Sequence, residues 1–591
     1  MSDLCTCPPT TIGNPTAPDP ECPHVTANQS ESEAVEEGLS AARAVAAYEI
    51  GDASWAEMMP LVERYVAESA PIETGSDAIE TYAAAIEAYL REATWLTAAD
   101  AVYKVHARKV AASLDQQVTE KGGVQSALAS TFGKVLDLLD KAGFIATLAS
   151  NSEFEIMRYL NHVADRFDLR RDIQLETRVA SATFDEASAR WTVLTEAGER
   201  FDGQYLMMAT GCVSIPQPPA FKGLETFEGD WYHSANWPRE GVDFAGKRVG
   251  LIGTGSSGVQ MTPVIAEQAA HLTVFQRTAN FSVPAQNEPL TEATLAHVKA
   301  HYAERRALAR EAVTGVFLSA NDKSALEVSD EDRLKEFEFR WRGAGGGFRM
   351  LRAFNDLLRN PIANQCAGDF VRGKIRATVK DPAKAEILCP KPDLPFGTKR
   401  LCVDTHCYET FNRDNVDLVD VKAHPITEIT PTGLRTTQGH HELDVIVFAT
   451  GFDAMTGALL AMDIRGTGGQ SLREKWAAGP RTYLGVSIAG FPNLFVIAGP
   501  GSPAALSNVV HSIETHVDWI SNFIGHSRSK GTRRIEAEQA HEDQWVDHVN
   551  EVANQTLYPV GNSWYLGANM PGKPRVFMPY AAGVPAYRRI I

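Results

Sequence analysis

The sequence predicts an α/β fold that follows an all-helical N-terminal region. Two observations carry this prediction. Near residue 250 a short apolar strand, a glycine-rich turn and a helix come in direct succession, which is the layout of a nucleotide-binding unit. Near residue 150 the composition changes, because the first 150 residues hold 22 acidic residues, 9 basic residues and only 8 of the 45 glycines. Alanine-rich sequence with few glycines favours helices, whereas the later composition suits strands joined by tight turns.

The composition of the 591-residue chain excludes several classes of protein. Hydrophobic residues make up 44% and charged residues 22%, which is the range of folded globular proteins. No apolar run is long enough to span a membrane, and the first residues lack the layout of a signal peptide. The net charge of −18 disfavours nucleic-acid binding. We therefore expect a cytoplasmic protein with neither a membrane nor a nucleic-acid partner.

The cysteines predict neither a disulfide framework nor a metal site. Eight cysteines in 591 residues are too few for a disulfide scaffold. Near the N-terminus, potential ligands occur with spacings that match no common structural zinc site: Cys5, Cys7, Cys22 and His24. We interpret residues 1–30 as a disordered leader. We expect reduced thiols at the other positions: Cys212, Cys366, Cys389, Cys402 and Cys407.

Hydrophobic periodicity indicates the elements that precede the nucleotide unit. Residues 31–150 show helical patterns and no βαβ unit. Glu155–Phe167 is expected to form one amphipathic helix with Ile156, Tyr159, Leu160 and Val163 on one face. Alternating runs at Gln174–Phe184 and Arg190–Thr195 predict antiparallel strands. The apolar run Tyr205–Ala209 is typical of a buried strand that ends at a ligand crevice.

The nucleotide-binding unit starts with the expected strand Arg248–Ile252. The turn Gly253-Thr254-Gly255-Ser256-Ser257-Gly258 follows, and the helix is expected to run through Ala269. In such a turn the first glycine permits a tight bend, the second lets pyrophosphate approach the backbone, and the third allows close packing of helix on strand. A second strand is expected at Leu272–Phe275, and it is followed by Gln276-Arg277-Thr278. An acidic residue at that place would favour NAD, whereas a cation and a hydroxyl suit the 2′-phosphate of NADPH.

A second pattern lies directly before this unit. The string Phe227-Glu228-Gly229-Asp230-Trp231-Tyr232-His233-Ser234-Ala235-Asn236-Trp237-Pro238 matches F-x-G-x-x-x-H-x-x-x-W-P. It resembles the fingerprint of Baeyer–Villiger monooxygenases, which are class B flavoprotein monooxygenases, and the phenylacetone and steroid monooxygenase branch in particular. Further segments resemble that family in the same order: Val447–Asp453, Phe396–Leu401, Phe491–Phe495, Gly499–Pro503 and Ser563–Tyr565. The resemblance covers about residues 151–591.

The resemblance implies a reaction, two cofactors and a set of site residues. It implies NADPH- and O2-dependent insertion of oxygen beside a ketone carbonyl, through a flavin C4a-peroxide, to give an ester or lactone. It places Lys399 and Trp564 at the NADPH, together with Gly253–Gly258, Arg277 and Thr278. Arg400 matches the active-site arginine near FAD, where a permanent positive charge stabilises anionic intermediates. Ala504, Ala505 and Leu506 fall in the loop that lines the substrate pocket in this branch.

The resemblance also implies a domain organisation, from which the N-terminal part departs. The expected fold has a Rossmann-like NADPH domain, residues 237–395, inserted in an FAD domain formed by residues 151–236 and 396–591. Residues 290–380 are expected to be a helical insertion. Members of the family begin with their own FAD-binding strand–GxGxxG–helix, but residues 1–150 contain no G-x-G-x-x-G. The helices expected in residues 31–150 would stand in that place.

This departure leaves three interpretations open. In the first, the chain is a monooxygenase whose FAD is held by a divergent N-terminal arrangement or by a partner chain. In the second, it is a remnant that binds NADPH without oxygenating a substrate. In the third, it is a scaffold whose helices form an interaction module, with a partner chain or an oligomer contacting residues 31–145.

Overall fold

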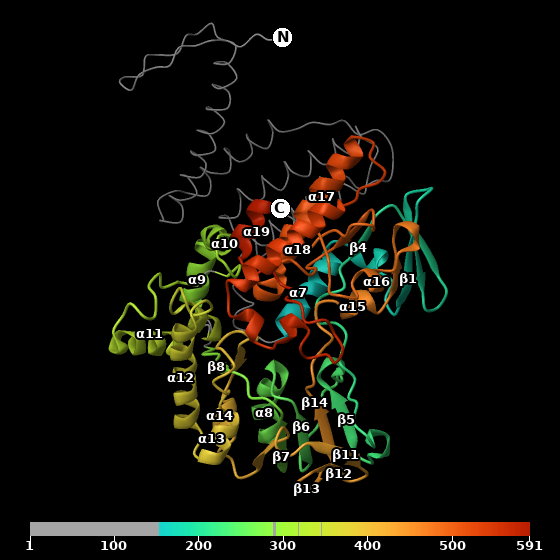
Figure 1. Cartoon of the computed structure of the whole chain (residues 1–591). Coiled ribbons are helices and arrows are strands. Elements are labelled where there is room, and N and C mark those ends of the chain that lie inside the picture. Colours follow the sequence, from blue (N-terminus) through green and yellow to red (C-terminus); the bar gives the residue numbers. More distant parts are fainter. Residues whose placement is uncertain (1–152, 288–290, 317, 344–345) are drawn as a thin grey trace, which may run out of the picture. The chain divides into compact units, whose positions relative to one another are not determined.

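The computed structural model describes residues 153–287, 291–316, 318–343 and 346–591. All of them belong to one compact unit (Figure 1). The predictions for residues 1–30 and 31–150, and the residues Cys5, Cys7, Cys22 and His24, lie outside the described residues. The predicted α/β class is confirmed for the remainder, which is built from mixed helices and strands.

A five-stranded parallel sheet forms the centre of the nucleotide-binding part. Its strands lie in the order β10-β7-β6-β14-β5. Their bounds are β5 Asp230–His233, β6 Arg248–Ile252, β7 His271–Gln276, β10 Val416–Asp420 and β14 Val445–Phe448. The middle strands are continuous apolar runs, as parallel strands covered on both faces require. Val249, Leu251 and Val447 are accordingly fully buried.

The strands of this sheet come from all three segments that were expected to form the two domains. Among the strands of this sheet, β5 comes first in the chain, and it pairs with β14 although it precedes residue 237. Two strands beyond residue 395 also belong to the sheet, because β10 pairs with β7 and β14 pairs with β6. The sheet therefore runs from β5 to β14, across the expected boundaries at 237 and 395, which stay predictions. Short strands like β10 and β14 carry no local mark of the sheet that they join, since their partners are distant in sequence.

Helices cover the sheet and extend from it. In Figure 1, α8 (Ser256–Gln268) lies against β6 and β7. The segment expected to be helical contains α9 (Glu292–Ala300), α10 (Tyr302–Arg310), α11 (Asp330–Arg342) and α12 (Pro361–Thr378), with an irregular stretch between α10 and α11. The amide oxygen of Asn360 accepts from the backbone of Ile362 and Ala363, and Pro361 follows it, so α12 begins with a capping residue and a proline at its first position. Two shorter helices follow: α13 (Pro382–Leu388) and α14 (Cys407–Thr410).

The second part of the unit has its own sheets. The predicted antiparallel pair is confirmed as β1 (Val179–Asp185) and β2 (Arg190–Thr195) in a sheet of order β15-β1-β2-β3. The strand expected at 205–209 is β4 (Leu206–Met208), which pairs in parallel with β16 (Leu494–Val496). Its burial is incomplete among the described residues, since Met207 is 43% exposed. The β1–β2 sheet is completed by β3 (Arg200–Gly203) and β15 (Asp463–Arg465). The strands of the unit that belong to neither large sheet nor to the β4–β16 pair are β8 (Ser282–Pro284), β9 (Cys402–Asp404), β11 (Ile426–Thr430), β12 (Gly433–Thr436) and β13 (Gly439–Glu442).

The remaining helices flank these sheets. The first is α7 (Glu153–Arg166), which confirms the helix expected at 155–167. Its face differs from the expectation among the described residues, because Val163 is buried but Ile156 and Leu160 are 43% and 53% exposed. The C-terminal region supplies α15 (Gly457–Leu460), α16 (Leu472–Lys475), α17 (Val509–Ser529), α18 (Gln539–Asn554) and α19 (Val584–Ile590). No helix in the described ranges is long and apolar enough to cross a membrane.

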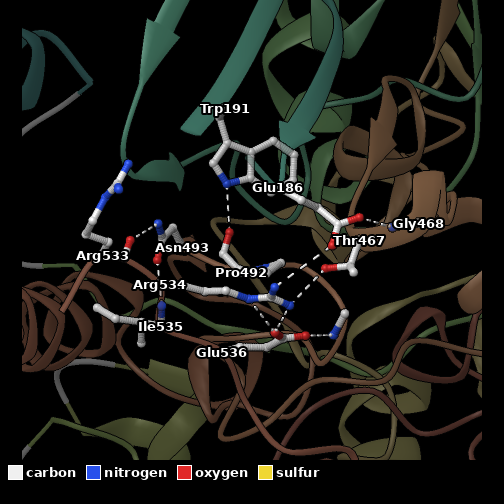
Figure 2. A network of polar contacts seen from close by, with 11 residues as sticks. Glu186, Trp191, Thr467, Gly468, Pro492, Asn493, Arg533, Arg534, Ile535 and Glu536 are labelled. Carbon is white, nitrogen blue, oxygen red and sulfur yellow. Dashed lines mark hydrogen bonds and ion pairs between the residues drawn. The ribbon is translucent and has the colours of Figure 1, made fainter. Parts of the chain in front are cut away.

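A polar network fixes the turn that leads into β16 (Figure 2). The indole nitrogen of Trp191 donates to the Pro492 carbonyl at 2.8 Å. Asn493, with φ 57°, donates to the Arg533 carbonyl and accepts from the Ile535 amide. Around this turn, Arg534 contacts side chains from three segments: Glu186, Thr467 and Glu536. The hairpin β1–β2, the β15 loop and the segment after α17 thereby hold β16, and with it the loop that follows β16, in place.

Candidate active site

The glycine-rich turn has the shape that a bound pyrophosphate requires. Gly253 has φ 110°, and a Cβ on it would lie 2.5 Å from the Ala449 carbonyl oxygen. A Cβ on Gly258 would lie 2.0 Å from the Gly253 carbonyl oxygen, so α8 can pack this close to the turn only with glycine there. A Cβ on Gly255 would meet no protein atom within 4 Å. The middle glycine is therefore open toward solvent, in front of the N-terminus of α8, where Ser256 and Ser257 begin the helix.

Two cations lie together beside this turn. Arg277 is exposed directly after β7, and Lys399 is half-buried in the loop before β9. Burial lowers the pKa of Lys399, and the nearby charge of Arg277 lowers it further. The Thr254 hydroxyl donates to the Thr278 carbonyl at 3.4 Å, which ties the end of β7 to the glycine-rich turn. A pair of mutually repelling cations next to an open helix N-terminus is suited to a phosphate group.

Arg400 lies one residue further along and faces a different set of groups. Its Nη1 donates to the Ala505 carbonyl at 3.1 Å, and its Cζ lies 4.8 Å from the centre of the Phe348 ring. Within the described part of the chain, no carboxylate forms an ion pair with Arg400. Burial raises the pKa of the Tyr565 phenol, while the neighbouring Arg400 charge lowers it in part. The net effect keeps that buried phenol protonated at neutral pH.

The expected pocket loop and Trp564 belong to one apolar cluster beside Arg400. Ala504, Ala505 and Leu506 form a 3-10 turn in which Ala504 and Ala505 are buried. Trp564 packs with its ring centre 4.4 Å from that of Tyr565. The same cluster includes Cys212 and Met455. They belong to the two linking segments, residues 212–217 and 450–455, which connect the two parts of the unit. The structure thus brings together Arg400, Ala505, Leu506 and Trp564.

The two groups of residues adjoin each other through consecutive positions. Lys399 belongs to the nucleotide group and Arg400 to the apolar group. Two residues later, the Cys402 sulfur lies 3.7 Å from the Ser256 hydroxyl at the start of α8. The Asn280 amide donates both to the Arg400 carbonyl and to Cys402. The Ser256–Cys402 contact therefore links the start of α8 to the segment that carries Arg400.

The residues of the F-x-G-x-x-x-H-x-x-x-W-P string lie at the junction of the two parts. His233 ends β5, where its Nδ1 accepts from the Ala235 amide and its Nε2 contacts the Thr450 hydroxyl at 3.1 Å. Burial lowers the pKa of His233, so the ring is neutral and its Nε2 carries the proton that is donated to Thr450. The Thr450 hydroxyl in turn donates to the Gln217 carbonyl. His233 therefore ties the sheet to both linking segments.

The linking segments are themselves paired. The Gln217 amide donates to the Gly451 carbonyl at 2.9 Å, and the Asp453 amide donates to the Ile215 carbonyl at 2.8 Å. Elsewhere in the string, Gly229 is required by space, because a Cβ there would lie 2.3 Å from the Asp444 carbonyl oxygen and 2.7 Å from the Phe227 ring. Trp237, followed by Pro238, packs on Tyr232 and Phe244. These residues shape the junction and do not touch Arg400.

Sequence reasoning missed several groups of this site. Phe348, Asn280 and Cys212 come from three separate segments, and nothing in their local sequence marks them. Tyr565 lay in the quoted Ser563–Tyr565 string and could have been found there. A cavity of about 600 Å³ lies elsewhere, between α8 and α14, and contains none of the predicted site residues.

Comparison with known proteins identifies the family. A family model described as flavin-binding monooxygenase-like matches residues 147–287. A Baeyer–Villiger monooxygenase of Pseudooceanicola batsensis is 43% identical over 438 residues, which are 74% of this chain and 79% of that protein. The chain belongs to the Baeyer–Villiger monooxygenase family.

Solved structures of the family agree with this assignment. The structure of an oxidized steroid monooxygenase bound to NADP is 51% identical, with a TM-score of 0.71, over 74% of this chain and 82% of that one. A crystal structure of OTEMO in complex with FAD and NADP is 38% identical, with a TM-score of 0.72, over the same shares. The predicted family and the two-domain flavoprotein fold are thereby confirmed.

Proposed function

We propose that the chain is an NADPH- and FAD-dependent monooxygenase that uses O2 to insert oxygen next to a ketone carbonyl, giving an ester or lactone. The observation that carries this proposal is the place of Arg400. Its guanidinium lies against an apolar loop and a buried tyrosine, while the preceding residue, Lys399, belongs to the nucleotide site. One short segment thus joins the two cations beside the glycine-rich turn to an apolar cluster that contacts a guanidinium. Relatives about 40% identical over most of the chain support this function over a remnant or a scaffold.

The residues present fit NADPH. The space in front of Gly255 admits a pyrophosphate, and the N-terminus of α8 faces it. Arg277 and Lys399 would hold the 2′-phosphate, with Thr278 beside them, because guanidinium and ammonium groups form charge-assisted hydrogen bonds with phosphate. Trp564 would contact the ribose side of the nicotinamide. Selection of NADPH over NADH would then rest on the two cations.

The residues around Arg400 fit the flavin end of FAD. Bound FAD supplies the redox chemistry, by accepting a hydride from NADPH and activating O2. The Arg400 guanidinium would stabilise negative charge that develops at the reacting centre. Tyr565 stays protonated, and the Ala505 carbonyl orients the guanidinium. Among the described residues β6–α8 is the one strand–GxGxxG–helix unit. In this proposal a divergent N-terminal arrangement or a partner chain would hold the ADP half of FAD.

The apolar cluster beside Arg400 also indicates how water would be kept away from the guanidinium. Ala504 and Ala505 are buried, and Leu506 and Trp564 pack on the same cluster as Tyr565. Removing water strengthens the field of the Arg400 charge, because the effective dielectric constant falls. The cytoplasmic location and a partner for residues 31–145 stay predictions.

The test combines cofactor content with ketone-dependent turnover. Full-length protein should bind FAD and oxidise NADPH faster when a ketone is present, with ester or lactone as product. Arg400→Ala should bind NADP+ normally but lose product formation. Arg305→Ala, an exposed arginine on α10, removes the same charge and serves as the matched control. Unchanged ketone-dependent turnover in Arg400→Ala would refute the proposed role of Arg400, and protein that binds NADP+ but no FAD would support the remnant.

A further inference from the structure

Two residues near the loop that carries Ala505 adopt an unusual backbone conformation. Leu484 and Ala498 both have φ 57°, the left-handed region that residues with a Cβ avoid. Both are buried, at 4% and 7% exposure, so solvent does not relieve the conformation. Such a conformation persists only where surrounding contacts enforce it. Leu484 lies in a turn closed by the Val486 amide, which donates to the Tyr483 carbonyl at 3.1 Å. In addition, Leu484 and Ala498 each form one hydrogen bond with the same pair of side chains.

That pair is His516 of α17 and Tyr587 of α19. The Ala498 amide donates to His516 Nδ1 at 2.9 Å. His516 Nε2 lies 2.7 Å from the Tyr587 hydroxyl, and that hydroxyl donates to the Leu484 carbonyl. Because Nδ1 accepts, the proton of the neutral ring sits on Nε2 and is donated to the Tyr587 oxygen. We call this chain of hydrogen bonds, from the Ala498 amide through His516 and Tyr587 to the Leu484 carbonyl, the relay. His516 and Tyr587 are 0% and 1% exposed, so the polar atoms of the relay are satisfied inside the protein.

The relay contacts the start of the loop whose Ala505 carbonyl accepts a hydrogen bond from Arg400. Ala498 is followed by Gly499–Pro503 and then by the turn Ala504–Leu506, whose Ala505 carbonyl accepts from Arg400. The loop runs tightly against Gly485, the residue after Leu484, since a Cβ on Gly499 would lie 2.5 Å from the Gly485 carbonyl oxygen. Fixing Leu484 and Ala498 therefore fixes both sides of this close approach.

We propose that His516 and Tyr587 are positioning residues, which hold the loop from Ala498 to Leu506 so that the Ala505 carbonyl orients Arg400. Neither residue is seen to contact Arg400, and both act through the backbone. The inference rests on the proposed function in one respect, the catalytic use of Arg400. The C-terminal helix α19 thereby contributes to the geometry of the pocket.

The chain offers a matched set of variants. Tyr587→Phe removes only the hydroxyl of the relay. Tyr580→Phe makes the same change on a neighbouring buried tyrosine, whose hydroxyl contacts His548 at 3.0 Å and whose ring centre lies 6.0 Å from that of Tyr587. His516→Asn keeps an acceptor for the Ala498 amide, whereas His516→Leu removes it. A merely structural role predicts that Tyr587→Phe and Tyr580→Phe behave alike.

The first measurement is amide hydrogen exchange of residues 498–506 in the full chain. Tyr587→Phe and His516→Leu should exchange faster there by about two- to tenfold, the factor that loss of one ordinary hydrogen bond gives. Tyr580→Phe should match the wild type in this segment, and His516→Asn should lie closer to the wild type than His516→Leu does. Equal exchange in Tyr587→Phe and Tyr580→Phe would overturn the proposal.

The second measurement is the fraction of oxidised NADPH that yields oxygenated product at saturating ketone. This fraction should fall in Tyr587→Phe and His516→Leu while KM for NADPH stays unchanged, because Arg277 and the glycine-rich turn are untouched. A rise in KM with no change in the fraction would count against positioning of Arg400. If the wild type oxygenates no ketone, the proposed function fails, and the exchange measurement still decides whether the relay holds the loop.

Discussion

Removing Arg277 should separate the binding of NADP+ from the binding of NAD+. The guanidinium is exposed at the end of β7, and its charge adds to burial in lowering the pKa of Lys399, as is expected for two neighbouring cations. Arg277→Ala leaves Lys399 in place and relieves its repulsion, so part of the phosphate site survives. The variant is therefore expected to bind NADP+ weakly rather than not at all.

The magnitude follows from the kind of contact and its exposure. Hydrogen bonds to charged groups contribute about 1.5–3 kcal/mol. Because solvent competes at an exposed site, we take the lower half of that range, about 1.5–2 kcal/mol. This corresponds to a dissociation constant about 10- to 30-fold higher. NAD+ has no 2′-phosphate, so its affinity should change less than about twofold, an energy near RT ln 2.

The assay is titration of NADP+ and NAD+ into full-length protein, read by calorimetry. Arg305→Ala on α10 is the control for loss of one exposed positive charge. The screening of charges gives a second check, since the difference between wild type and Arg277→Ala should shrink at high salt. Equal weakening of NADP+ and NAD+ in Arg277→Ala would refute the assignment, because the arginine would then serve the whole site rather than the 2′-phosphate.

Four further predictions concern the turn, the arginine and the buried histidine. Gly258→Ala should lower stability by about 1–3 kcal/mol through overpacking against the Gly253 carbonyl. Gly255→Ala should leave the thermal midpoint unchanged yet weaken NADP+ by about tenfold or more, because its methyl group occupies the space of the pyrophosphate. Arg400→Lys should lower the rate of oxygenation by about 10²-fold or more while the protein keeps its affinity for NADP+, since a point charge cannot reproduce the guanidinium contacts. Burial lowers the pKa of His516 from 6.5 to about 4, so the unfolded chain binds the proton more readily than the folded chain does. The neutral ring therefore contributes about 3 kcal/mol to stability above pH 6.5, and this contribution is lost as the pH falls to 4. Urea unfolding from pH 7 to pH 4 should show this loss in the wild type and in His526→Asn, an exposed position of α17, but not in His516→Asn.

The features that the sequence predicts correctly are those encoded by neighbouring residues. The strand, turn and helix around Gly253–Gly258 are visible because an apolar run, three glycines and a helical pattern follow one another within about twenty residues. The antiparallel pair β1 and β2 is visible for a similar reason, since both strands alternate and a short turn joins them.

The features that the sequence does not predict depend on contacts between distant segments. Arg400 bonds to a carbonyl 105 residues away, and its identity could be proposed only through the resemblance of Phe396–Leu401 to a known segment. The sheet membership of β10 and β14 was missed because the position of a strand in a sheet is set by its partners. The His516 relay likewise joins α17, α19 and two loop residues that no local pattern connects.

The paired linking segments have a consequence for the protein once its chain is cut. Both ends of the region from Phe227 to Phe448 return to one short ribbon, in which residues 215–217 pair with residues 451–453. A protease that cleaves once within this region leaves each fragment anchored in that ribbon and in the central sheet. The nicked protein should therefore migrate as one species under native conditions and as two fragments only after denaturation. Its ability to bind NADP+ should survive a cut that lies far from the glycine-rich turn.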